Sequence, residues 1–150
     1  MRVKRAKEDD VKKVAEIEYL SGYKWSQNKK KTFQMIEKVF KEKYCEIYIL
    51  EDKEPIGYFA ISFDKNKSLC YLNYFAVNKK YQGLGLSKKM VKEVINISKI
   101  NKYKAIELAV WGKNFPAITL YSKFRFYVTE ITRNKYPNGD SKLRMRKDLK

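Results

Sequence analysis

Apolar residues along the first third of the chain recur every three or four positions, as they do on one face of a helix. This spacing predicts two amphipathic helices, one from Val11 to about Leu20 and one that begins after a loop over 21–28. A short strand over 2–6 comes first, and three acidic residues follow it, where a helix dipole favours negative charge. Near residue 45 the apolar period changes to that of a strand.

Short apolar runs separated by turn residues fill the middle of the chain. They predict strands over 46–50, 56–63 and 69–77, and turns at 51–55 and 64–67 that favour an antiparallel meander. The pattern continues with a helix over 86–100, a strand over 105–110, a helix over 114–124, and strands over 126–132 and 142–149. This order, β-α-α-β-β-β-α-β-α-β-β, predicts an α/β (α+β) fold with one mixed central sheet of about seven strands flanked by about four helices. No linker or repeat interrupts the chain, so we expect one domain over residues 1–150.

Charge is the strongest compositional bias, with 34 Lys and Arg against 17 Asp and Glu and a net charge of +17. Such a surface attracts polyanions, including nucleic acid and phosphorylated cofactors. Because the lysines are spread along the whole chain, a lysine-rich proteome explains the charge as well as a dedicated binding surface does. Both explanations stay open.

The residues that are missing or rare exclude several chemistries. The chain has no histidine, which excludes Ser-His-Asp and Cys-His catalysis. With only Cys45 and Cys70 as soft ligands we expect no metal site, and we expect both cysteines to be small, buried, free thiols. The longest apolar runs are too short to span a bilayer and the first residues do not resemble a signal peptide, so we expect a cytoplasmic protein without a membrane partner.

A glycine-containing turn, Gln82-Gly-Leu-Gly-Leu-Ser87, stands between a predicted strand and the long predicted helix. Glycine lets the backbone turn tightly and lets a ligand approach, and the N–H groups of the first helical turn favour an anion. The spacing matches neither a Walker A loop nor a Rossmann fingerprint, whose third glycine would stand at Lys88. A turn of this kind also occurs without a ligand, so the surrounding sequence has to decide.

Two longer segments supply that context. Residues 75–87 resemble the cofactor motif of the GNAT N-acetyltransferase superfamily, Arg/Gln-x-x-Gly-x-Gly/Ala, with Gln82, Gly85 and Ser87 in its three places. Residues 110–126 resemble the second motif of that family, with Asn114 and Tyr121 in place and Arg125 where a glycine is usual. The resemblance implies a GNAT-type fold, acetyl-coenzyme A as co-substrate, no metal, and transfer of an acetyl group to a primary amine.

The resemblance also implies roles for individual residues. The backbone of the strand should pair with the pantetheine arm, the turn should hold the pyrophosphate, and Asn114 should contact the pantetheine. The implied cofactor residues are Phe75, Ala76, Val77, Gln82, Gly83, Leu84, Gly85, Leu86, Ser87, Lys88 and Asn114. Tyr121 is the implied proton donor to the thiolate, and backbone N–H groups of residues 75–77 could stabilise the oxyanion.

The general base is less well defined. Ala109 stands where the most similar subgroup, the ribosomal-protein-alanine acetyltransferases, carries a glutamate. Glu107, two residues earlier on the same side of the strand, is the nearest carboxylate, although a salt-bridged surface glutamate explains it equally well. Asn73 or a tyrosine could instead hold a water that takes the proton.

The acceptor stays open between several classes of amine. A protein N-terminal α-amine is one, supported by looser subgroup matches at Ile17-Glu18, Lys24-Trp25-Ser26 and residues 132–149. A polyamine, an aminoglycoside or an amino acid is another class of acceptor. A separate alternative is that the chain is a basic RNA- or ribosome-binding module without catalysis. No specific nucleic-acid motif is present, and a homodimer is left open.

Overall fold

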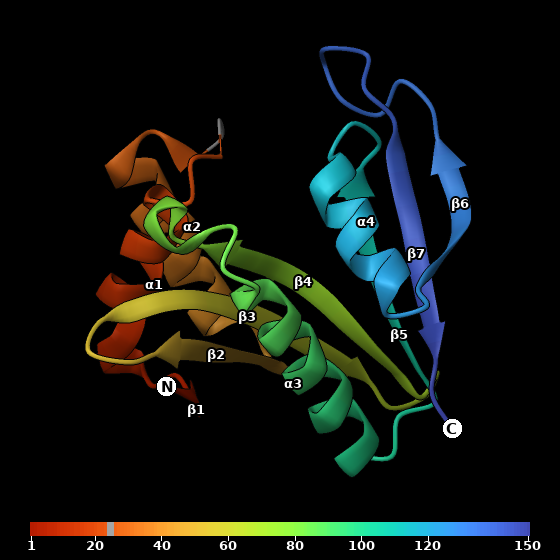
Figure 1. The fold of residues 1–150 in the computed structure, drawn as a ribbon, viewed down its shortest axis with the longest axis horizontal. Helices are drawn as coiled ribbons and strands as arrows, with labels where there is room; N and C mark the ends of the chain where they lie inside the picture. Colours follow the sequence, from red (N-terminus) through yellow and green to blue (C-terminus); the bar gives the residue numbers. More distant parts are fainter. Residues whose placement is uncertain (24–25) are drawn as a thin grey trace. The chain divides into compact units, whose positions relative to one another are not determined.

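Helices and strands follow one another in the order that the hydrophobic pattern predicts. The protein is represented by a computed structural model that describes residues 1–23 and 26–150; Lys24 and Trp25, which the loop prediction and one of the looser motif matches include, lie outside the described residues (Figure 1). The strands are β1 (Arg2–Arg5), β2 (Cys45–Glu51), β3 (Pro55–Asp64), β4 (Leu69–Val77), β5 (Ala105–Trp111), β6 (Tyr127–Thr132) and β7 (Lys142–Asp148). The α-helices are α1 (Val11–Tyr19), α2 (Lys29–Lys41), α3 (Leu86–Ile100) and α4 (Phe115–Lys123), with single 3-10 turns η1 (Glu8–Asp10) and η3 (Lys79–Tyr81).

The strands form one mixed sheet in the order β1-β2-β3-β4-β5-β7-β6. Neighbouring strands run antiparallel from β1 to β3 and from β5 through β7 to β6, whereas β4 and β5 are parallel. Seven strands and four α-helices among the described residues confirm the predicted fold class.

Several predicted boundaries differ by one residue from those observed. The strand predicted from Phe126 begins at Tyr127, because Arg125 has a left-handed φ of 66° that turns the chain and Phe126 is buried at 4% exposure. The helix predicted over 114–124 spans Phe115–Lys123, with Asn114 as its N-cap.

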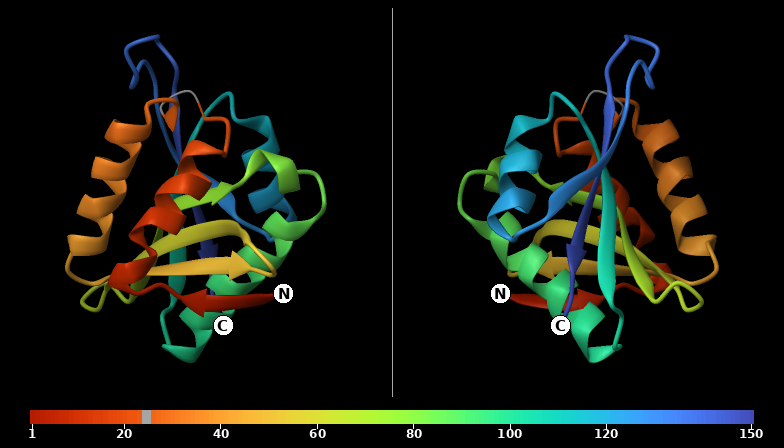
Figure 2. Two further views of the ribbon diagram at one scale, coloured as in Figure 1. Left: turned by 90° about the vertical axis from the view of Figure 1, so that its left-hand side faces the viewer. Right: turned by 90° about the vertical axis from the view of Figure 1, so that its right-hand side faces the viewer.

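Residue contacts divide the chain into two compact units, Met1–Ser62 with Tyr74–Met90, and Phe63–Asn73 with Val91–Lys150. The expectation of one domain over residues 1–150 stays a prediction. In the first unit, α1 and α2 lie side by side against β2 to β4 (Figure 2). Their buried apolar residues include Val14, Ile17 and Ile36, which follow the predicted helical spacing.

The first turns of α3 are fixed to this unit through a small residue in β3. An added side-chain carbon at Gly57 would lie 2.9 Å from the carbonyl oxygen of Ala76 and 2.9 Å from the Met90 sulfur. Glycine at this position therefore allows α3, which follows the glycine turn, to approach the strands closely.

The second unit has its core on one face of β5 and β7. Ile106, Leu108 and Met145 are buried there, together with Tyr121 of α4. Cys70 of β4 is also buried, Cys45 of the first unit is partly buried, and both cysteines are free, as predicted. Among the described residues, no helix combines the length and the apolar character needed to cross a membrane.

Candidate active site

The glycine turn has the backbone geometry of an anion cradle. Gly83 and Gly85 have φ angles of 80° and 77°, in the left-handed region that favours glycine. No heavy atom lies within 4 Å of where a side-chain carbon would stand at either position. The turn opens directly into α3, and Lys88 and Lys89 in its first turns are exposed. The backbone is thus open to a phosphate at the positive end of a helix, and the residues present fit a diphosphate group.

The Gln82 side chain connects this turn to other residues of the first unit by hydrogen bonds. Its side-chain nitrogen donates to the carbonyl oxygens of Ser21 and Val77, at 2.9 Å each. A third hydrogen bond, from the N–H of Lys79 to the carbonyl of Leu20 at 2.8 Å, joins η3 just before the glycine turn to the end of α1. The Gln82 side-chain donor is directed at the carbonyls of Ser21 and Val77, so Gln82 orients the turn.

The strand β4, which leads into the turn, continues beyond the residues that pair with β5. The register of β4 with β5 runs from Leu69 to Leu72, whereas β4 continues to Val77. The hydroxyl of Tyr23 donates to the carbonyl of Phe75 at 3.3 Å. Burial, reinforced by the Glu18 carboxylate, raises the pKa of Tyr23 to about 12, so this hydroxyl stays protonated at neutral pH. Binding of pantetheine by the Phe75 and Val77 backbone stays a prediction.

Glu18 is a buried carboxylate that the sequence analysis noted only as part of a loose motif. It is 3% exposed, and its two oxygens accept hydrogen bonds from Ser26 and from Tyr58, each at 2.7 Å. An acidic residue four positions after Val14, on the apolar face of α1, is the signal that could have revealed it. The contact with Ser26 joins α1 to the segment between α1 and α2.

In the second unit, the structure places Asn114 and Tyr121 on one short helix. The Asn114 side-chain oxygen accepts the N–H of Ala117 at 3.3 Å and caps α4. Tyr121, seven residues later and roughly 10 Å along the axis, is 6% exposed with its ring 5.6 Å from that of Phe126. The roles of both residues toward a cofactor stay predictions.

Glu107, the carboxylate predicted as the nearest replacement for a glutamate at position 109, forms an ion pair with Arg146. The guanidinium of Arg146 donates to its oxygen at 3.1 Å, and this arginine also binds Asp148 at 2.9 Å. These contacts, with Asp148 the larger cause, raise the pKa of Arg146. Ala109, in the expected position of the base, pairs in register with Arg144 of β7.

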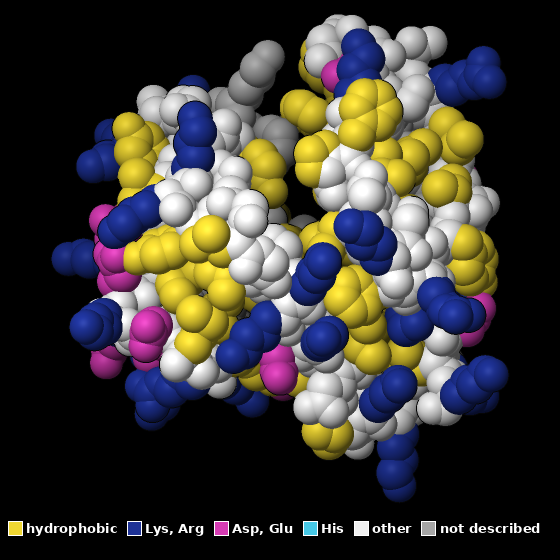
Figure 3. All heavy atoms as spheres, in the orientation of Figure 1, with side chains coloured by type: hydrophobic (Ala, Val, Ile, Leu, Met, Phe, Trp, Pro, Cys, Tyr) yellow, Lys and Arg dark blue, Asp and Glu magenta, His cyan; other side chains and the backbone are white. Residues whose placement is uncertain are grey.

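The candidate site residues thus fall into two groups. Those from Phe75 to Val77 and from Gln82 to Lys88 lie together in the first unit, and Glu107, Asn114 and Tyr121 lie in the second. Among the described residues, no group of three Cys, Asp or Glu side chains could hold a metal ion. Basic side chains are scattered over the visible face rather than gathered on one element (Figure 3).

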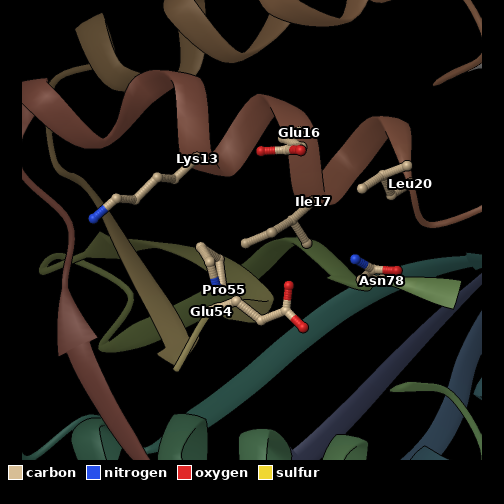
Figure 4. Close-up of a pocket in the computed structure, with 7 residues that line it drawn as sticks. All are labelled: Lys13, Glu16, Ile17, Leu20, Glu54, Pro55 and Asn78. Atoms are coloured by element: carbon tan, nitrogen blue, oxygen red, sulfur yellow. The ribbon is translucent and has the colours of Figure 1, made fainter. Parts of the chain in front are cut away.

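A pocket of about 60 Å³ in the first unit lies between α1 and the turn before β3 (Figure 4). Glu16 and Glu54 contribute carboxylates to it, but Glu54 already accepts hydrogen bonds from Lys80 and Tyr81. A cavity of this size has room for a few water molecules and not for a cofactor as large as coenzyme A.

Comparison with known proteins identifies the family to which the chain belongs. The sequence profile of the acetyltransferase (GNAT) family matches residues 9–126, which include the glycine turn, Asn114 and Tyr121. The chain belongs to this family. Its two motifs predicted this membership.

Individual GNAT relatives differ in the acceptors that their names give. A probable spermine N(1)-acetyltransferase of Bacillus subtilis subsp. natto is 39% identical over 64 residues, which span 42% of each chain. The ribosomal-protein-S18-alanine N-acetyltransferase of Escherichia coli has a TM-score of 0.82 at 18% identity, over 99% of this chain and 93% of that one. A Bacillus subtilis acetyltransferase in complex with CoA has a TM-score of 0.78 at 16% identity and 99% coverage of both chains. At such identities the structures show a common fold.

Proposed function

We propose that this GNAT enzyme acetylates a primary amine of low pKa, in particular the α-amine of a protein or peptide N-terminus. The observation that carries the proposal is the pairing of Ala109, where a catalytic glutamate is expected, with Arg144 of the neighbouring strand. A cation beside the acceptor disfavours an ammonium group, and an α-amine titrates near 7.7–8.0 where a lysine amine titrates near 10.4. An α-amine is therefore already partly neutral at pH 7 and needs no strong base.

The remaining roles are proposed for residues of this chain. The N–H groups of Gly83 to Lys88 bind the pyrophosphate, and the backbone of Phe75 to Val77 together with Asn114 orients the pantetheine arm. Tyr121 donates a proton to the departing thiolate sulfur. Glu107 is the proposed base, acting directly or through a water.

Coenzyme A release with three acceptors tests the proposal: a peptide with a free α-amine, the same peptide Nα-acetylated but containing a lysine, and spermidine. We expect the free α-amine to react fastest at pH 7. Tyr121→Phe should lower kcat about a hundredfold or more, the range of general acid catalysis, with little change in acetyl-CoA affinity. Tyr44→Phe, at an exposed tyrosine just before β2, is the matched control. An unchanged rate for Tyr121→Phe would reject Tyr121 as the acid, and failure to bind millimolar acetyl-CoA would reject the whole proposal.

A small polyamine is the second candidate acceptor, and one observation favours it. The relative matched at 39% identity is named a probable spermine N(1)-acetyltransferase, although the match covers 42% of its length. Preferential acetylation of spermidine in the same assay would select this candidate.

A further inference from the structure

The face of β5 that contains the expected base position continues onto β7 as a row of basic side chains. The cross-strand pairs are Glu107 with Arg146, Ala109 with Arg144, and Trp111 with Lys142. Partners in register on antiparallel strands project from the same face of the sheet. The 3.1 Å ion pair between Glu107 and Arg146 marks this face, so Arg144 and Lys142 project from the same side as Ala109 and Trp111.

The charges along this row are not neutralised equally. Arg146 is bound by Glu107 and Asp148, whereas Arg144 and Lys142 form no ion pair among the described residues. Arg144 is exposed. Glu130 lies in register with Arg144 on β6, but its carboxylate accepts the Thr132 hydroxyl at 3.4 Å and does not come within 4 Å of the guanidinium. An anion from outside the chain can therefore still pair with Arg144 and Lys142.

Aromatic rings flank the end of this row. The Trp111 ring lies 5.1 Å from the Tyr136 ring at an interplanar angle of 60°. Tyr136 belongs to the loop between β6 and β7, and this loop is fixed to the end of β5. The N–H of Gly112 donates to the carbonyl of Ser141 at 2.8 Å, which anchors one end of the loop.

The charges of this loop add to the basic character. Its one acidic residue, Asp140, is 8% exposed and paired with Lys113 at 3.2 Å. Arg133 and Lys135, in the same loop, form no ion pair among the described residues. We call Trp111, Tyr136, Lys142 and Arg144 the Trp111 corner.

We propose that the Trp111 corner binds an acidic side chain near the N-terminus of the acceptor, so that the enzyme selects peptides with Asp or Glu after the reactive residue. This inference rests on the proposed function, which places the α-amine beside Ala109. Trp111 lies two residues further along the strand, about 7 Å away. An extended peptide covers that length in about two residues, which brings its second or third side chain to Lys142. A polyamine would instead place its further cations beside Arg144 and Lys142.

Three amidated peptides of equal length test this inference: one with Asp and Glu, one with Gly and Ser, and one with two arginines after an N-terminal alanine. Arginine is used because it adds charge without a second acceptor amine. We expect kcat/KM to be highest for the acidic peptide and lowest for the basic one. Each of Lys142→Gln and Arg144→Gln should reduce the acidic preference about two- to fivefold, the strength of an exposed ion pair, and leave the Kd for acetyl-CoA unchanged.

Lys92→Gln, at an exposed lysine of α3, is the matched control and should keep the wild-type preference. Equal rates on the three peptides, or an acidic preference that survives both substitutions, would overturn the inference while α-amine acetylation stood. Acetylation of spermidine in preference to every peptide would overturn the proposed function, and this inference with it.

Discussion

Replacing Gln82 with methionine tests whether its side chain orients the glycine turn or binds the cofactor. Methionine keeps the length and shape of glutamine but removes both N–H donors. The two hydrogen bonds to Ser21 and Val77 are 2.9 Å long. A hydrogen bond contributes about 0.5–1.5 kcal/mol net. Because Gln82 is exposed, the lower half of that range applies, and Gln82→Met should lower the free energy of unfolding by about 1–2 kcal/mol.

The effect on cofactor affinity separates the two roles. If Gln82 only orients the turn, the backbone N–H groups remain and the Kd for acetyl-CoA should rise by less than about tenfold, or 1.4 kcal/mol. Gln82→Arg keeps side-chain donors and should restore most of the stability. Gln34→Met, at an exposed position of α2, should change neither quantity. Urea unfolding with an unchanged m-value reports the stability, and calorimetric titration reports the Kd.

Two outcomes would contradict this reasoning about Gln82. Unchanged stability in Gln82→Met would mean that the two carbonyls are equally well satisfied by water. A rise in Kd of a hundredfold or more would mean that the side chain contacts the cofactor directly.

Two further predictions concern the first unit. Gly57→Ala would place a methyl group 2.9 Å from the carbonyl oxygen of Ala76, and should lower the free energy of unfolding by about 1–3 kcal/mol in urea, as overpacking does. The pKa of Tyr58 is raised well above its usual range, by burial first and by the Glu18 carboxylate second. Because its folded pKa exceeds its unfolded pKa, its contribution to stability is full below about pH 10 and is lost as the pH rises further. The melting temperature should fall as the pH rises from 8 to 11, and Tyr58→Phe should reduce this fall. An equal dependence of the melting temperature on pH in the variant would exclude Tyr58 as its source.

Local patterns were sufficient for the order of elements and for the glycine turn. The periods of apolar residues report which face of a helix or strand is buried, and they predicted α3 over Leu86–Ile100 and β4 over Leu69–Val77 with the bounds observed. The turn was predictable because the left-handed φ angles at Gly83 and Gly85 are a property of the glycines themselves. Element ends were less predictable, since the left-handed φ of Arg125 separates Phe126 from β6 and this conformation is unusual for a residue other than glycine.

The partners of polar side chains were decided by the tertiary structure alone. Gln82 bonds to a carbonyl 61 residues away, Glu18 to a tyrosine 40 residues away, and Glu107 to an arginine 39 residues away. Each contact depends on the register of strands and on how α1 packs, which arise from the summed packing of many residues and not from any short segment. The sequence by itself therefore determined the family, the fold and the glycine turn. Only the folded chain placed Arg144 beside Ala109 and Arg146 on Glu107, and these two arginines guide the inference about the acceptor.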